Sequence, residues 1–128
     1  KTAMKIFSLK KRGVIINVSS CVGETGNAFQ SVYAATKAGL VALSKSLAKE
    51  AAALHEEHNI RVLSISPGFI ETNMTDVLPE AEKAKYLKMI PSNRFGNADD
   101  IAETVLFLLS DKANYINGTD IKVNGGMA

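Results

Sequence analysis

The stretch "VIINVS", residues 14–19, decides the fold class of this chain. It is short, rich in β-branched residues and nearly all apolar, which is typical of a strand covered on both faces in a parallel sheet. A second run, "IRVLSIS" at residues 60–66, has the same character and stops at Pro67-Gly68. Near the carboxyl end, "TDIKVNGG" predicts a third, more amphipathic strand.

Helical patterns separate these strands. Residues 31–54 carry apolar side chains at helical spacing, and one face of this segment is thin because it consists of alanine and glycine. The apolar positions are Leu40, Leu43, Leu47, Ala51 and Leu54, and the thin face holds Ala34, Ala35, Ala38, Gly39 and Ala42. A thin face allows another helix to approach closely. We also expect a short helix over residues 79–89.

A further helix is predicted after Asn97, which is a favourable N-cap residue. Its buried side would consist of Ile101, Val105, Leu108 and Leu109. The first residues, through Arg12, are typical of the last turns of a helix with cations near its end and Gly13 as the stop. Strands alternating with helices predict an α/β protein with a doubly wound parallel sheet.

Composition favours a small-molecule ligand. With 15 basic and 13 acidic residues the net charge is +2, so we expect neither nucleic acid nor an anionic membrane as partner. No apolar run approaches the roughly 20 residues that span a bilayer. The single cysteine, Cys21, cannot form an intrachain disulfide and is more easily understood in a reducing compartment.

Ligands of such sheets bind at the carboxyl ends of the strands, where Ser19-Ser20 and "SPGFIETNMT" lie. Tyr33 and Lys37 are four residues apart on the predicted helix, so both side chains share one face. A nearby ammonium favours the phenolate form and would make Tyr33 a usable general acid/base, while Ser20 could donate a hydrogen bond to a substrate oxygen. Alone, the pair Y-x-x-x-K is weak, because solvated helix faces carry it by chance. The strand-end serine and the Pro-Gly turn strengthen the catalytic interpretation.

Four stretches carry a family resemblance: "GNAFQSVYAATKAGL", "KSLAKE", "SPGFIETNMT" and "PSNRFGNADDIAETVLFLLSDKANYINGTDIKVNGG". With them the chain resembles the carboxyl-terminal half of the short-chain dehydrogenase/reductases, and most of all the 3-oxoacyl-[acyl-carrier-protein] reductases. The resemblance covers most of the chain. It implies that residues 1–128 form the carboxyl-terminal part of a single Rossmann-type reductase domain.

The resemblance also implies roles for the site residues. Ser20 would polarise the substrate carbonyl, Tyr33 would pass it a proton, and Lys37 would tune Tyr33 and bind the nicotinamide ribose. The cofactor-binding set would comprise Tyr33, Lys37, Pro67, Gly68, Ile70 and Thr72, with the Ile70 backbone against the carboxamide and Thr72 near the same end. No metal is expected.

The implied activity is NADPH-dependent reduction of a 3-oxoacyl thioester on acyl carrier protein to the 3-hydroxyacyl product in fatty acid synthesis. NADP(H) is expected in preference to NAD(H), together with a homodimer or homotetramer in the cytoplasm or, in a eukaryote, an organelle matrix. One alternative is a short-chain dehydrogenase acting on an acyl-CoA, a sugar or a steroid alcohol. An alternative of another class is a non-catalytic oligomerisation fragment.

Parts of the family pattern have no counterpart here. Neither a glycine-rich phosphate loop nor the catalytic asparagine of a preceding helix matches these 128 residues. We therefore expect a longer native polypeptide with an N-terminal dinucleotide-binding half, which would also pair the free edge of the "VIINVS" strand.

Several other residues carry open interpretations. Phe29 replaces a residue that is usually small, and it would either narrow the acyl channel or pack. Glu56 and Glu57 weaken the carrier-protein assignment, for which Lys10, Lys11 and Arg12 could still serve. His55 and His58 are expected to be a solvated helix end rather than a metal site. Arg94 is expected to fix a loop by an ion pair rather than to anchor a phosphate, and Met74 and Met89 would line an acyl pocket or fill gaps.

Overall fold

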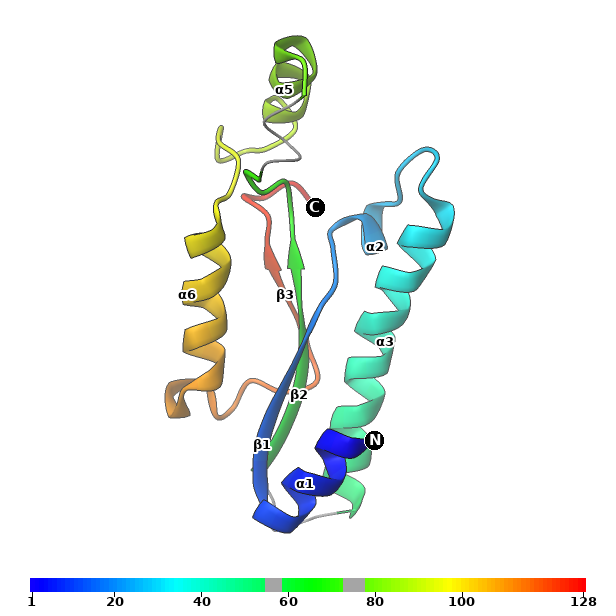
Figure 1. Ribbon diagram of the computed structural model, residues 1–128, viewed down its shortest axis with the longest axis vertical. Helices are drawn as coiled ribbons and strands as arrows, with labels where there is room; N and C mark the ends of the chain where they lie inside the picture. The colour runs from blue at the N-terminus through cyan, green and yellow to red at the C-terminus, as the bar shows by residue number, and fades with distance from the viewer. Residues whose placement is uncertain (55–58, 73–77) are drawn as a thin grey trace.

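The computed structural model describes residues 1–54, 59–72 and 78–128. The elements occur in the order α1 (Thr2–Lys10), β1 (Arg12–Val18), α2 (Val22–Thr25), α3 (Ser31–Leu54), β2 (Asn59–Pro67), α5 (Glu80–Leu87), α6 (Ala98–Leu109), the 3₁₀ turn η1 (Asp111–Ala113) and β3 (Asp120–Val123). The strands form a parallel sheet in the order β1-β2-β3 (Figure 1). The predicted α/β class with a parallel sheet is confirmed.

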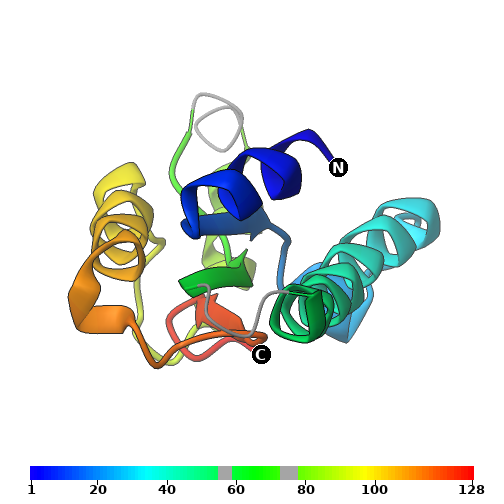
Figure 2. The same cartoon turned by 90° about the horizontal axis from the view of Figure 1, so that it is seen from below.

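Helices cover both faces of this sheet. Figure 2 shows α6 and α3 on opposite sides of the strands, with α1 beside β1. The β1–β2 ladder runs from the pair Arg12↔Asn59 to the pair Val18↔Ile65, and β3 joins at the carboxyl half of β2. Within the described ranges, no helix is both long enough and apolar enough to cross a membrane.

The face of the sheet toward α6 is apolar. Leu63 and Ile65 of β2 pack with Leu108 of α6 and with Ala113, and all four are buried. Partly buried apolar residues surround them: Val14, Ile16, Ile101, Val105, Ile116 and Ile121. Each fully buried leucine or isoleucine contributes about 1.5–3 kcal/mol relative to exposure, so this cluster is the main hydrophobic core.

The opposite face, toward α3, is polar at the carboxyl half of the strands and apolar nearer their start, where Ile60 and Val62 are buried. The side chain of Asn17 in β1 donates to Ser44 Oγ of α3 at 2.9 Å, and Ser44 Oγ donates to the Leu40 carbonyl at 2.8 Å. On β2, Ser64 Oγ donates to the Asp120 carboxylate of β3 at 2.6 Å. Ser44 and Ser64 are completely buried. The hydrogen bonds are what make this burial tolerable, because an unpaired buried hydroxyl would be costly.

Helix α3 has the bounds predicted from its periodicity. Its buried face holds small side chains, namely Ser44, Ala48 and Ala51. Leu43 lies one residue away from this face and is 47% exposed, so its expected place among the apolar positions of the helix does not correspond to burial. Of the thin alanine and glycine face, Ala35, Gly39 and Ala42 are exposed.

Both ends of α6 are fixed. At its start Asn97 and Asp100 form a capping box, which confirms Asn97 as the predicted N-cap. At its end the buried Arg61 of β2 donates to the Leu108 carbonyl at 2.7 Å and to the Ile116 carbonyl at 3.3 Å. Burial lowers the pKa of Arg61, an effect opposed by the charge of Asp111. The predicted burial of Leu109 is wrong: this last residue of α6 lines a pocket with Gly13 and Val14 of β1 and is 51% exposed.

The predicted stop of the first helix at Gly13 is also wrong. Helix α1 ends at Lys10, and Lys11 takes the left-handed conformation with φ of 57°. Gly13 lies inside β1, where a Cβ atom would stand 2.2 Å from the ring of Phe7. The glycine therefore allows α1 to fold back against the strand.

Replacing Arg61 by leucine should lower the free energy of unfolding by about 2–3 kcal/mol, because buried carbonyl groups at the end of α6 would lose a charged donor. Arg61→Lys is the matched control: it keeps the charge but not the fork of donors, and it should lose less. Chemical denaturation measures both. An unchanged denaturation midpoint in Arg61→Leu would contradict this account of the helix end.

Candidate active site

A pocket of about 270 Å³ is lined by residues from α2, the start of α3, α5 and the segments that follow β1 and β2. Figure 1 shows α5 on one side of the carboxyl ends of the strands and α2 with the start of α3 on the other. Ser20 follows β1 and lines this pocket together with Tyr33 from the first turn of α3. The remaining lining residues are Cys21, Val22, Asn27, Gln30, Gly68, Phe69 and Tyr86. Two of the three candidate catalytic residues thus share one cavity.

Lys37, the third candidate, lies behind Tyr33. Its Nζ donates to the carbonyl of Val18 at 2.9 Å and stands 5.5 Å from the centroid of the Tyr33 ring. This is within the distance of a cation–π contact. Because an ammonium group has three donors, the bond to Val18 does not exhaust its capacity. Lys37 is not among the residues that line the pocket.

Short-range contacts set the direction of Ser20. Its Oγ accepts a hydrogen bond from the backbone N–H of Val22 at 3.2 Å, and the Cys21 N–H donates to the Pro67 carbonyl at 3.0 Å. Helix α2 then packs tightly on α3, since a Cβ atom on Gly23 would lie 2.8 Å from the backbone nitrogen of Ala38. This close approach brings the loop that carries Ser20 next to the helix that carries Tyr33.

The segment after β2 forms the opposite wall. Gly68 donates from its N–H to the Val123 carbonyl at 3.0 Å and lines the pocket. The next residues run beside Gly96, whose N–H donates to the Phe69 carbonyl at 2.9 Å. Of the predicted cofactor residues on this segment only Gly68 lines the cavity. Pro67 ends β2, Ile70 pairs with Gly96, and Thr72 is exposed beyond them.

Tyr86 and Phe69 are pocket residues that the sequence did not single out as site residues. Phe69 belongs to the stretch "SPGFIETNMT" that follows the second strand, and this position is the only feature of the sequence that could have indicated a place in the pocket. Tyr86 belongs to α5, the short helix predicted over residues 79–89. Nothing in the spacing of so short a helix indicates which side chain faces the cavity.

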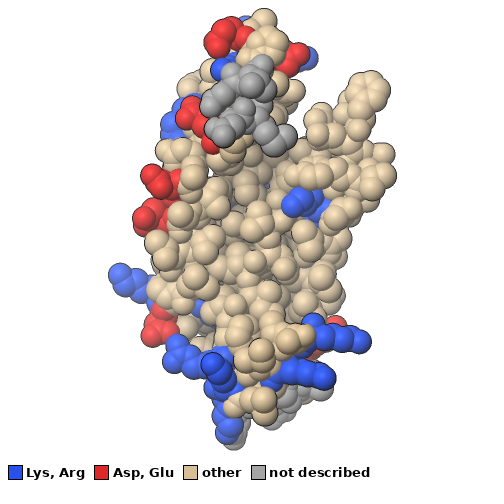
Figure 3. Space-filling view, viewed as in Figure 1, with Lys and Arg blue, Asp and Glu red and all other residues tan. Residues whose placement is uncertain are grey.

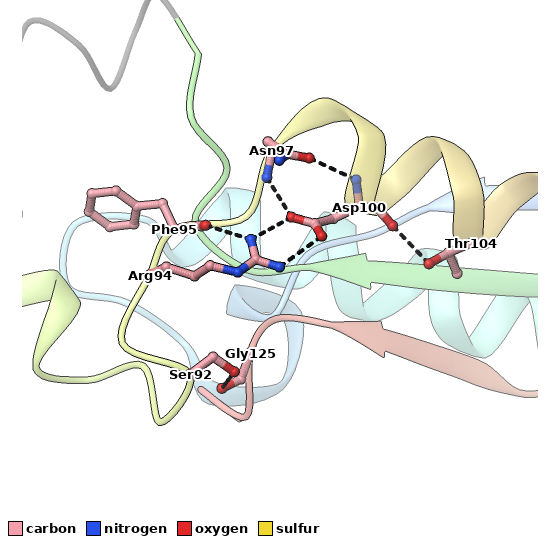
Figure 4. Close-up of polar contacts among 7 residues, drawn as sticks. All are labelled: Ser92, Arg94, Phe95, Asn97, Asp100, Thr104 and Gly125. Atoms are coloured by element: carbon pink, nitrogen blue, oxygen red, sulfur yellow. Dashed lines mark hydrogen bonds and ion pairs between the residues drawn. The ribbon is translucent and has the colours of Figure 1, made fainter.

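The loop before α6 is held by an ion pair, as expected for Arg94. Figure 4 shows the two guanidinium nitrogens of Arg94 donating to the two Asp100 oxygens, at 2.7 and 2.8 Å. Asp100 also accepts from the N–H of Asn97 at 2.8 Å. The hydrogen bond from Arg94, followed by that from Asn97, lowers the pKa of Asp100 to about 2. In return Asp100 raises the pKa of Arg94.

Basic side chains gather at the other end of the molecule. Figure 3 shows most Lys and Arg residues of this face near the beginning of β1, away from the carboxyl ends of the strands. Lys10, Lys11 and Arg12 are exposed there. Since β1 rises about 3.3 Å per residue, its seven residues put these cations about 20 Å from the pocket. They are therefore poorly placed to hold a carrier protein at the pocket mouth.

Other candidates have no place in the cavity. Phe29 is fully exposed with φ of 64°, so in the described part of the chain it neither narrows the pocket nor packs. Met89 is 52% exposed. Among the described residues no group of three or more His, Cys, Asp and Glu could hold a metal ion. The remaining candidates lie outside the described residues: His55, Glu56, Glu57, His58 and Met74.

The fold and the pocket together define a class. A parallel sheet covered on both faces, with a serine and a tyrosine in a cavity at the strand ends and a lysine one helical turn after the tyrosine, is the arrangement of an α/β oxidoreductase of the short-chain type. The whole chain, residues 1–128, matches a short-chain dehydrogenase/reductase family described as "Enoyl-(Acyl carrier protein) reductase". The chain belongs to this family.

Curated relatives agree with the family assignment. The chain is 50% identical over 127 residues to the 3-oxoacyl-[acyl-carrier-protein] reductase FabG of Haemophilus influenzae, covering 99% of this chain and 51% of that protein. It is 52% identical over 120 residues to the FabG of Aquifex aeolicus, covering 93% and 47%. With the Escherichia coli FabG the identity is 46% over 127 residues, covering 99% and 50%. The chain therefore spans about half the length of these relatives, as their carboxyl-terminal half.

Asp100 gives a pH-dependent prediction. Its pKa is lowered in the folded protein, so its contribution to stability is present above the unfolded pKa of about 3.9 and is lost as pH falls through about 2. Compared with wild type, Asp100→Asn should be less stable at neutral pH, and the difference should shrink between about pH 4 and 2. Denaturation at several pH values measures it. The control Asp99→Asn removes a carboxylate from the same turn but leaves the ion pair of Arg94 with Asp100 intact, so its stability should depend on pH as that of the wild type does. A stability difference between Asp100→Asn and wild type that stays constant between about pH 4 and 2 would refute this role of Asp100.

Proposed function

We propose that residues 1–128 form the carboxyl-terminal part of a single Rossmann-type domain that reduces a 3-oxoacyl thioester, carried by acyl carrier protein, to the 3-hydroxyacyl product in fatty acid synthesis. The main support for this proposal is the pocket that Ser20 and Tyr33 share, with Lys37 beside the tyrosine ring. The names of the FabG relatives support the substrate. The free edge of β1 supports a partner strand from an N-terminal half.

The chemistry required of these residues concerns the carbonyl oxygen. Ser20 Oγ would donate a hydrogen bond to this oxygen, and the Tyr33 hydroxyl would deliver the proton that completes the alcohol. Lys37, held on Val18, would keep a positive charge near the tyrosine while the proton is transferred. A bound nicotinamide cofactor supplies the hydride that reaches the carbonyl carbon.

The residues present fit one end of such a cofactor. Gly68 brings backbone to the pocket edge without a side chain, and Lys37 has donor capacity left for a ribose hydroxyl. We assign Tyr33, Lys37, Pro67, Gly68, Ile70 and Thr72 to the nicotinamide end. NADP(H) is proposed over NAD(H), and the protein is proposed to act in the cytoplasm or an organelle matrix, where its unpaired buried Cys21 stays reduced.

A second candidate reaction is reduction of the carbon–carbon double bond of a 2-enoyl thioester. The description of the matching family favours it. A serine and a tyrosine that line one cavity favour the 3-oxo substrate instead, because their hydroxyl groups can donate hydrogen bonds to the ketone oxygen that becomes the alcohol. Acyl-CoA, sugar and steroid alcohols complete the set of substrates to compare.

Tyr33→Phe in the full-length polypeptide should lower kcat/KM for a 3-oxoacyl thioester by at least about a hundredfold, because the proton donor is lost while the ring remains. The rate is followed by consumption of NADPH, with NADH in parallel, and circular dichroism verifies the fold. The wild type is assayed with the 2-enoyl thioester and the other substrates as well. Full turnover by Tyr33→Phe would refute the acid role, and a preference for the enoyl substrate would establish the second reaction.

The exposed thin face of α3 supports self-association as a homodimer or homotetramer. Ala35, Gly39 and Ala42 present almost no side chain, and a Cβ atom on Gly39 would meet nothing within 4 Å. Such a surface suits a second helix at short distance. We propose a second copy of α3 as that helix.

Gly39→Leu should dissociate the assembly by holding the two helices apart, and analytical ultracentrifugation measures the mass. Lys112→Leu, at an exposed position of η1 and outside α3, is the control and should leave the mass unchanged. An undiminished mass for Gly39→Leu would exclude this interface. If residues 1–128 alone associate but never bind NADPH, they are a non-catalytic oligomerisation fragment.

A further inference from the structure

Ser19 directly precedes the candidate catalytic residue Ser20 and is buried, with only 3% of its surface exposed. It is not among the residues that line the pocket, and the catalytic proposal gives it no role. Its backbone N–H donates to the Ile65 carbonyl at 2.8 Å, which continues the pairing of β1 with β2. Its hydroxyl donates to α3, at the carbonyl of Lys37, over 2.8 Å. Ser19 therefore connects the middle strand of the sheet to the helix of the other two candidate catalytic residues.

The acceptor of this hydrogen bond is a backbone atom inside α3. A carbonyl oxygen has two lone pairs, so it can accept from Ser19 and still take part in the hydrogen bonding of the helix. The contact therefore fixes the helix backbone, which cannot rotate away as a side chain can. Tyr33 lies one turn before Lys37, about 6 Å earlier along the axis. Fixing the backbone at Lys37 thus also limits where Tyr33 can lie.

A second contact reaches the same peptide of α3. Gly23 of α2 lies against it, since a Cβ atom on this glycine would stand 2.8 Å from the Ala38 nitrogen and 3.0 Å from the Lys37 carbonyl carbon. The N–H of Gly23 also donates to the Ser20 carbonyl at 3.0 Å. Ser20 therefore lies between two residues, Ser19 and Gly23, that both contact the peptide joining Lys37 to Ala38.

We propose that Ser19 is a positioning residue, which sets the distance between Ser20 and the turn of α3 from Tyr33 to Lys37 through its hydrogen bond to the Lys37 carbonyl. The inference rests on the proposed function, in which the hydroxyl groups of Ser20 and Tyr33 act on one carbonyl oxygen. Groups that act together must be held within about 0.5 Å of their productive positions. Without the Ser19 hydroxyl, the helix and the strand end lose a direct connection beside both groups.

Ser19→Ala in the full-length polypeptide should lower kcat for a 3-oxoacyl thioester about tenfold and change KM by less than about twofold. The reason is that misplaced catalytic groups weaken the transition state more than the binding of the substrate. Consumption of NADPH gives the rate, and circular dichroism verifies the fold. Ser19→Thr keeps a hydroxyl group at this position and should recover most of the lost kcat.

Ser44→Ala is the matched control for a loss of stability. Ser44 is another buried serine between α3 and β1, because its Oγ accepts from Asn17 at 2.9 Å and donates to the Leu40 carbonyl at 2.8 Å. It lies about 10 Å farther along the helix than Lys37. Ser44→Ala should lower the denaturation midpoint at least as much as Ser19→Ala, since Asn17 loses its acceptor. Its kcat should nevertheless stay within about twofold of wild type.

The outcomes separate this inference from the one it rests on. An unchanged kcat in Ser19→Ala, or an equal loss in Ser19→Thr or Ser44→Ala, overturns the role of Ser19 alone. If the wild type reduces another carbonyl substrate but no 3-oxoacyl thioester, the proposed substrate is wrong, and the same variants assayed on that other substrate still decide the role of Ser19. A wild type that reduces no carbonyl substrate overturns both.

Discussion

Two hydrogen bonds between α3 and the end of β1 are the constraint on which the candidate site depends. Ser19 Oγ donates to the Lys37 carbonyl at 2.8 Å, and Lys37 Nζ donates to the Val18 carbonyl at 2.9 Å. The strand end and the helix therefore hold one another at neighbouring positions. Because β1 is hydrogen-bonded along its length to β2, the sheet fixes the positions of Ser20, Tyr33 and Lys37 relative to one another.

The other wall of the pocket depends on α6. The ion pair of Arg94 with Asp100 and the cap at Asn97 fix the loop that ends in Gly96, and Gly96 is bonded to the segment that carries Phe69. Phe69 then supports Tyr86. Polar contacts outside the cavity thus position the aromatic wall formed by Phe69 and Tyr86. The wall that carries Ser20 and Tyr33 is positioned by the sheet. The two walls are linked where the Cys21 N–H donates to the Pro67 carbonyl.

Sequence reasoning succeeded where the signal was periodic or local. The strands at residues 14–19 and 60–66, the bounds of α3 and the Asn97 cap all follow from spacing or from one cap residue. The shared pocket of Ser20 and Tyr33 followed from the rule that ligands meet parallel strands at their carboxyl ends. What escaped prediction is decided by contacts between distant segments. The ring of Phe7 explains Gly13 as a strand residue, and the ring of Phe69 sets the direction of Tyr86.

The alternation along β2 carries a consequence for folding. Leu63 and Ile65 face the apolar core, while Ser64 lies on the polar side with its hydroxyl bonded to Asp120. A slip of this strand by one residue would turn every side chain to the wrong face, so serines would enter the core and leucine would meet Asn17 and Ser44. Misregistered intermediates would then lose both the apolar contacts and the hydrogen bonds at once. The hydrogen bonds of Asn17 and Ser64 on the face toward α3 therefore help to select the correct register of β2 during strand pairing.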